Sequence, residues 1–184
     1  MPAPPSCFAA IPVVATEQLL ALQRALPDEL RPIHPDDLHL TIAYFGRIDP
    51  ALHPTVLQAL AQIRFDGATV RLGSPEALPS RDYPSAIVLT LLADAGLDAV
   101  AALMQEHRPP LLELAGRDPE DREPLPHITF ARPRGRQMST EKRQAILDWS
   151  DGQPALDSPL DLRGIVLMRS RPPRDTGPYY EIVR

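Results

Sequence analysis

Apolar residues recur along this chain with two different spacings. Runs in which every position or every second position is apolar are typical of strands, whereas apolar residues three and four positions apart are typical of helices that pack one face on a core. The first spacing predicts strands over 7–14, 38–46, 68–72, 85–92, 126–132, 160–168 and 179–183. The second spacing predicts helices over 16–25, 53–63, 94–107 and 139–149.

The order of these elements divides the chain into two similar halves of alternating strands and helices. This alternation predicts an α+β fold, and a length of 184 residues is that of one domain. We therefore expect a single domain over 1–184, made of two pseudo-symmetric lobes with a ligand cleft between them. The stretch 109–126 is the least regular part of the chain. Leu111, Leu112 and Leu114 either extend the preceding helix or anchor a loop, and 116–123 is a charged segment rich in turn residues.

One four-residue pattern occurs twice, each time in a predicted strand. Residues 39–42 read His-Leu-Thr-Ile, and residues 127–130 read His-Ile-Thr-Phe. Because alternate residues of a strand share a face, each strand presents one imidazole and one hydroxyl on one side and apolar residues on the other. If the two strands lie side by side, two imidazoles and two hydroxyls would surround one small cavity.

This set of side chains suits the cleavage of a phosphodiester without a metal. A free imidazole titrates near pH ~6.5, so His39 and His127 can act as an acid and a base at neutral pH. The hydroxyls of Thr41 and Thr129 can donate hydrogen bonds to the non-bridging oxygens of a phosphate. For either strand alone a buried core histidine is the alternative interpretation, but the repetition in matching apolar surroundings favours a functional site.

Composition and charge narrow the classes of partner. The formal net charge is −5, which argues against a general binding surface for long nucleic acids but not against an enzyme that acts on one nucleotide end. Cys7 is the only cysteine, so no disulfide framework or cysteine metal site is expected. No apolar run reaches the ~18 residues of a membrane span, and the first residues lack the basic start of a signal peptide. We expect a cytoplasmic protein and, without an obvious apolar interface stripe, a monomer.

The two motifs and their surroundings resemble the 2H phosphoesterases, a superfamily named for two H-x-[TS]-x motifs. Within it the chain looks most like the bacterial and archaeal RNA 2′,3′-cyclic phosphodiesterases, also called 2′-5′ RNA ligase-like proteins. The resemblance rests on the opening strand at 8–11, the first motif within 37–46 and the second within 126–132. It implies a bilobal α+β fold with two antiparallel sheets that line a central cleft.

The resemblance also implies an activity and a role for each motif residue. The activity is the hydrolysis of RNA 2′,3′-cyclic phosphate ends to 2′-phosphate ends without a metal or another cofactor, and its reversal would be an ATP-independent 2′-5′ ligation. By analogy with the family, His127 is the general base that activates water, and His39 is the general acid that protonates the departing 3′ oxygen. Thr41 and Thr129 would bind the phosphate. The two motifs are nearly symmetric, so the sequence alone does not order the two histidines.

Three residues near the motifs are further candidates. Arg132 matches an arginine that follows the second motif in the family, which implies contact with the phosphate. Strict alternation from His127 would point Arg132 to the opposite face, so this contact requires a bulge or the end of the strand. Tyr44 stands at the equivalent place after the first motif, and either Tyr44 or Phe8 could stack on a base.

Other functions remain open at this stage. The chemistry could act on a small nucleotide instead of an RNA 3′ end, or the chain could bind RNA ends without turning them over. A metal site at His34 and His39 is disfavoured because their spacing places them on opposite faces of a strand, and no H-E-x-x-H pattern occurs. We therefore expect RNA ends or small nucleotides with a 2′,3′-cyclic phosphate as partners, and no metal or membrane.

Overall fold

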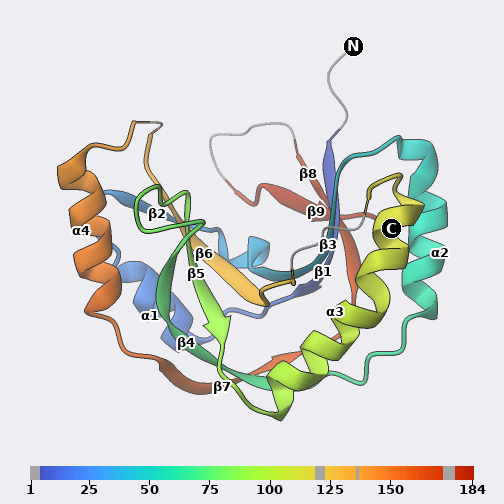
Figure 1. Ribbon diagram of the computed structural model, residues 1–184, viewed down its shortest axis with the longest axis horizontal. Helices are drawn as coiled ribbons and strands as arrows, with labels where there is room; N and C mark the ends of the chain where they lie inside the picture. The colour runs from blue at the N-terminus through green and yellow to red at the C-terminus, as the bar shows by residue number, and fades with distance from the viewer. Residues whose placement is uncertain (1–4, 119–122, 136, 172–176) are drawn as a thin grey trace.

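The computed structural model describes residues 5–118, 123–135, 137–171 and 177–184, and it shows one curled antiparallel sheet flanked by helices (Figure 1). The strands are β1 (Ser6–Pro12), β2 (Leu30–Pro32), β3 (His39–Arg47), β4 (Ala68–Leu78), β5 (Ala86–Leu91), β6 (His127–Pro133), β7 (Leu156–Leu162), β8 (Val166–Ser170) and β9 (Tyr180–Ile182). The helices are α1 (Glu17–Arg24), α2 (His53–Gln62), α3 (Ala95–Leu114) and α4 (Thr140–Asp151), with short 3₁₀ turns at η1 (Pro35–Asp37) and η2 (Pro50–Leu52).

The strand order is β7-β4-β5-β6-β3-β1-β8-β9, and β2 pairs with another part of β6. At the centre of this order, the pairing of β3 with β6 consists of one residue pair, Leu40 opposite Ile128. The sheet therefore has two halves that meet at the two motif strands. The predicted α+β fold is confirmed, and the two sheets that were expected are joined into one curled sheet at this pair.

Helices α1 and α4 lie beside one half of the sheet, and α2 and α3 lie beside the other (Figure 1). Three of them begin at a side chain whose oxygen accepts a backbone N–H of the first turn, namely Thr16 in α1, Asp94 in α3 and Ser139 in α4. Such caps each stabilise a helix by about 1 kcal/mol, and each of these three residues begins one of the helix ranges predicted from the sequence. Within the described residues, none of the helices is both long and apolar enough to cross a membrane.

The structure decides between the two alternatives for the start of the irregular stretch 109–126. Helix α3 continues through Pro109 and Pro110 to Leu114, so the leucines at 111, 112 and 114 extend the helix. A proline inside a helix removes one backbone hydrogen bond and is costly. Here Leu111 and Leu112 follow directly and are each only 3% exposed, so their burial in the core offsets that cost.

The predicted strand at 160–168 is two strands, because the chain turns at Gly164, which has a φ of +69°. Strand β4 extends to Leu78, well beyond the predicted end at 72, because its register shifts between Leu72 and Pro75 and the pairing with β5 then resumes. Strand β2 was missed, since three residues are too few to show a period.

Gly46, near the end of the first motif strand, supports a test of the fold. Its φ is +66°, and a Cβ there would collide with the guanidinium of Arg117, whose Nε donates a hydrogen bond to the carbonyl of Phe45 at 2.8 Å. We expect Gly46→Ala to lower the free energy of unfolding in urea by more than the ~1 to 2 kcal/mol that a left-handed backbone costs an alanine. Gly164→Ala is the matched control, since its φ is +69° and a Cβ there meets nothing within 4 Å. Equal losses of unfolding free energy in the two variants would show that the contact with Arg117 adds nothing to the cost of the substitution.

Candidate active site

The single pair between β3 and β6 brings the two motifs together. Leu40 and Ile128 are opposite each other and fully buried, so the residues that flank them point to the other face of the sheet. Antiparallel geometry then places His39 next to Thr129 and Thr41 next to His127. All four side chains are partly exposed. They form one patch on the face of the sheet opposite the buried Leu40 and Ile128.

Both histidines are held in the same way. The Nδ1 of His39 lies 2.6 Å from the carbonyl oxygen of Asp37, and the Nδ1 of His127 lies 2.7 Å from that of Leu125. A carbonyl can only accept a hydrogen bond, so each Nδ1 carries the proton and donates it. The Nε2 atom of each ring is left to exchange a proton with a substrate.

Arg132 shares the face of the motif side chains because β6 contains a bulge. Val88 of β5 pairs with Thr129 and Ile87 pairs with Ala131, so Phe130 is an extra residue in β6. Phe130 and Ala131 are both buried in the core. The next residue, Arg132, therefore returns to the face of Thr129. The bulge that a contact between Arg132 and a phosphate requires is thus present.

Tyr44 returns to the same face by a second bulge. Along β1, the alternate residues Phe8 and Ala10 pair with Tyr44 and Thr41 of β3, which are three positions apart. One residue between them is therefore extra, and Tyr44 lies on the side of Thr41. Tyr44 is 57% exposed, and its ring stacks beside that of Phe8 with centroids 6.5 Å apart.

Phe8 is placed differently from Tyr44. Its ring stacks on the imidazole of His39 with centroids 4.7 Å apart, and the edge of Tyr180 meets it at 4.9 Å. Tyr180 also contacts the edge of the His39 ring at 5.4 Å. Phe8 is only 2% exposed, so it acts on His39 as a packing partner and offers no open face to a base.

Two residues of this arrangement were not singled out from the sequence, Asp37 and Tyr180. The Asp37 carboxylate is 3% exposed and accepts hydrogen bonds from the backbone N–H groups of Tyr179 at 2.6 Å and Tyr180 at 2.9 Å. Asp37 thus holds the start of β9 through its side chain and His39 through its carbonyl. The adjacent Tyr179 and Tyr180, in a chain with only 5% aromatic residues, were the available signal.

Comparisons with known proteins agree with this geometry. The family described as LigT-like phosphoesterase matches residues 10–88, which include the first motif. A curated relative from Aeropyrum pernix, named RNA 2′,3′-cyclic phosphodiesterase, is 24% identical over 106 residues, which are 58% of this chain and 58% of the relative. The match thus spans little more than half of that protein's length.

Solved structures extend the likeness to the whole chain. Escherichia coli LigT in complex with 3′-AMP is 20% identical, covers 98% of this chain and 96% of its own, and superposes with a TM-score of 0.69. A protein from Thermus thermophilus is 23% identical, covers 97% and 95%, and has a TM-score of 0.65. The resemblance to the LigT-like 2H phosphoesterases is confirmed. The family model is described as a phosphoesterase and the relative is named as a phosphodiesterase.

The electrostatics of this LigT-like site centre on His39. Burial of the ring lowers the pKa of His39 below its ordinary value of 6.5. The carbonyl and the charge of Asp37 oppose this shift, and the positive charges of His127 and Arg132 add to it. Burial also raises the pKa of Tyr180. Burial, the largest of these effects, therefore favours a neutral imidazole at His39.

The lowered pKa of His39 leads to a prediction about stability. The unfolded chain binds a proton at this residue more readily than the folded chain, so stability is full above a pH of about 6.5 and is lost as the pH falls through the folded pKa. We expect the free energy of unfolding to fall as the pH is lowered from about 7 to 5, and to fall less in His39→Gln. His53, which is 7% exposed and has its pKa lowered chiefly by burial, contributes in the same direction in both proteins. Parallel pH curves for the two proteins would contradict the prediction.

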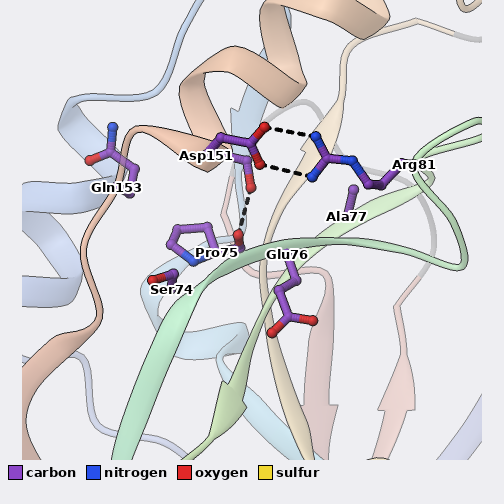
Figure 2. Close-up of a pocket in the computed structure, with 8 residues that line it drawn as sticks. Ser74, Pro75, Glu76, Ala77, Arg81, Asp151 and Gln153 are labelled. Atoms are coloured by element: carbon purple, nitrogen blue, oxygen red, sulfur yellow. Dashed lines mark hydrogen bonds and ion pairs between the residues drawn. The ribbon is translucent and has the colours of Figure 1, made fainter.

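A separate pocket of about 340 Å³ lies between β4 and the end of α4. Figure 2 shows Arg81 and Asp151 facing each other across it, joined by two hydrogen bonds of 2.8 and 2.7 Å. None of the predicted site residues lines this pocket. Arg81 and Asp151 satisfy each other, and Glu76, the other charged residue of the lining, accepts a hydrogen bond from the Oγ1 of Thr90 at 3.1 Å.

Metal ligands do not gather in the part of the chain that the structure describes. No three or more of its His, Cys, Asp and Glu side chains are grouped as they would be around a metal ion. The Nδ1 of His34 accepts a hydrogen bond from the backbone N–H of Asp36 at 3.2 Å, whereas the Nδ1 of His39 is engaged by Asp37. Each of these two rings is thus held by its own local contact.

Proposed function

We propose that this chain hydrolyses RNA 2′,3′-cyclic phosphate ends to 2′-phosphate ends. One observation carries the proposal: two imidazoles on one face of the sheet have their Nδ1 atoms fixed by carbonyls in the same way, with a threonine hydroxyl next to each. This arrangement supports the roles of an acid and a base on either side of a phosphate that the two hydroxyls hold.

In this mechanism His127 acts as the general base and His39 as the general acid, as the family analogy has it. The Nε2 of His127 takes a proton from water, and the water oxygen attacks the phosphorus. The bond from phosphorus to the 3′ oxygen breaks, and the Nε2 of His39 gives that oxygen a proton. The hydroxyls of Thr41 and Thr129 donate hydrogen bonds to the non-bridging oxygens. The positive guanidinium of Arg132 stabilises the negative charge on the phosphate.

The acid role requires His39 to carry a proton when substrate is bound. Burial of the ring disfavours the protonated form, because it lowers the pKa of His39. A bound phosphate brings a negative charge next to the imidazole and raises its pKa again, because an opposite charge favours the protonated form. The substrate itself thus supplies the condition for the acid step.

The substrate side of the proposal rests on Tyr44. Its ring is 57% exposed on the face of the motif residues, where the terminal base can stack on it, and Phe8 serves instead to orient His39. We further propose that residues 1–184 act as one domain of two lobes, as a cytoplasmic monomer without a metal or another cofactor. The reverse reaction would join a cyclic phosphate end to a 5′-hydroxyl without ATP.

The test is the hydrolysis of a short RNA that ends in a 2′,3′-cyclic phosphate, in the presence of EDTA, with the product end identified. We expect turnover to a 2′-phosphate. A 3′-phosphate product would reverse the assignment of the leaving oxygen. Turnover of small cyclic nucleotides but not of RNA would favour the alternative substrate, and binding without turnover of either would favour the binding module.

A further inference from the structure

Much of the aromatic content of this chain gathers around His39. The chain contains four phenylalanines, four tyrosines and one tryptophan. One of the phenylalanines and three of the tyrosines form a continuous row of rings, in the order Tyr44, Phe8, Tyr180 and Tyr179, with successive centroids 6.5, 4.9 and 4.9 Å apart. Phe8 and Tyr180, in the middle of the row, both contact the imidazole of His39. The row therefore borders the residue that acts as the acid in the proposed mechanism.

The two ends of this row differ from its middle in exposure. Phe8 is 2% exposed and Tyr180 is partly buried, whereas Tyr44 is 57% exposed and Tyr179 is 48% exposed. An exposed aromatic ring is a platform on which a nucleic-acid base can stack. The row thus presents one platform at each end, joined by a packed centre.

The platform at Tyr179 is held in place through its backbone. The N–H of Tyr179 donates to the carboxylate of Asp37 at 2.6 Å, and its carbonyl accepts from the N–H of Arg171 at 2.8 Å. Its ring meets that of Tyr180 at an interplanar angle of 80°, and such an edge contact covers at most one face of the Tyr179 ring. A ring that is already held loses little freedom when a base binds to it, which favours binding.

The proposed chemistry determines on which side of the phosphate the nucleotide lies. Water attacks from the side of His127, and the departing 3′ oxygen lies opposite, next to His39, because the attacking and leaving oxygens are in line. The 3′ oxygen belongs to the ribose. The terminal nucleoside and the RNA on its 5′ side therefore extend from the His39 side of the phosphate, which is where the row of rings lies.

We infer that the ring of Tyr179 stacks on the base of the nucleotide that precedes the terminal one, while the terminal base lies on Tyr44. Two rings separate the platforms, so the two bases are splayed apart, as the unstacked bases of single-stranded RNA can be. This inference rests on the proposed function and specifies its substrate as an oligonucleotide end instead of a mononucleotide. Every base has a π face, so the platform at Tyr179 accepts any of the four.

The experiment compares two substrates that differ in a single base. Both are dinucleotides that end in adenosine 2′,3′-cyclic phosphate, and the preceding nucleotide carries adenine in one and is abasic in the other. We expect the wild-type kcat/KM to be about tenfold or more higher for the first. This ratio should fall toward one in Tyr179→Ala and be kept in Tyr179→Phe. Tyr83→Ala, which removes a 77% exposed tyrosine between β4 and β5, is the matched control and should keep the ratio.

The abasic substrate separates this inference from the proposed function. If the wild type turns over both substrates with a ratio near one, or if Tyr179→Ala retains the wild-type ratio, the platform is overturned and the proposed hydrolysis stays intact. Equal losses of rate on both substrates in Tyr179→Ala would also overturn it, because the ring would then only support the surroundings of His39.

A binding measurement covers the case in which the wild type turns over neither substrate, so that the proposed function fails. Calorimetry would then compare the two dinucleotides with a 3′-monophosphate in place of the cyclic phosphate. A preference for the adenine-bearing compound that Tyr179→Ala abolishes and Tyr83→Ala keeps would support the platform. Equal affinities of the wild type for the two compounds would overturn it.

Discussion

Replacement of either motif histidine by alanine is expected to lower kcat for a 2′,3′-cyclic phosphate by about 10²- to 10⁴-fold, the range typical of a lost general acid or base. The reason is geometric, because the Nδ1 of each ring is fixed by a carbonyl and each Nε2 is left to exchange a proton. Steady-state rates of His39→Ala and His127→Ala, measured in EDTA on the same substrate, check this.

The control for this prediction is His34→Ala. His34 lies five residues before His39 and bonds only to the adjacent turn at Asp36. We expect its kcat to stay within about twofold of the wild type, as for a residue outside the reacting group. The double variant His39→Ala/His127→Ala should lose far less than the product of the two single losses, since residues that act as a unit are not additive. Single variants that keep wild-type rates would end the two-histidine mechanism.

The second large effect is expected at Asp37. Asp37→Ala removes the carboxylate that accepts from the backbone N–H groups of Tyr179 and Tyr180, and both groups lose their partner. An unsatisfied buried donor costs about 1 to 3 kcal/mol, so we expect the free energy of unfolding to fall by about 2 kcal/mol or more. We also expect kcat to fall, because the start of β9 would no longer hold Tyr180 against His39.

Two variants separate these effects of Asp37. Asp36→Ala changes the neighbouring exposed carboxylate and should leave stability within about 0.5 kcal/mol of the wild type. Tyr180→Phe keeps the ring that contacts His39 and should retain its rate, whereas Tyr180→Leu should not. An Asp37→Ala protein with wild-type stability and kcat would show that β9 is held by other contacts.

The repeated motif made the centre of the fold predictable, because the two-residue period alone determines which side chains share a face with His39 and His127. The rule that every second residue faces the same side no longer applies where a strand contains an extra residue. Arg132 and Tyr44 both lie beyond a bulge, so simple alternation assigned them to the wrong face. A bulge depends on the pairing with the neighbouring strand, and that pairing is not visible in one chain segment.

The remaining differences have a similar cause. Asp37 acts on backbone groups of Tyr179 and Tyr180, more than 140 residues away in the chain, and no local pattern reports such a contact. Likewise, burial of Leu111 and Leu112 keeps α3 helical through two prolines, which a propensity argument alone rejects. The roles of the individual site residues and the assignment of one domain with two pseudo-symmetric lobes stay predictions.

The junction at Leu40 and Ile128 has a mechanical consequence. Since this is the one residue pair between β3 and β6, a small rotation of one sheet half about it would change the separation of the two imidazoles and break few hydrogen bonds. The distance between His39 and His127 is then set by the packing of core side chains beneath the pair. It is not set by a long run of hydrogen-bonded residue pairs between β3 and β6. The pair of Leu40 and Ile128 is thus the place in the sheet where a rotation would change the gap between His39 and His127 with the least loss of strand pairing.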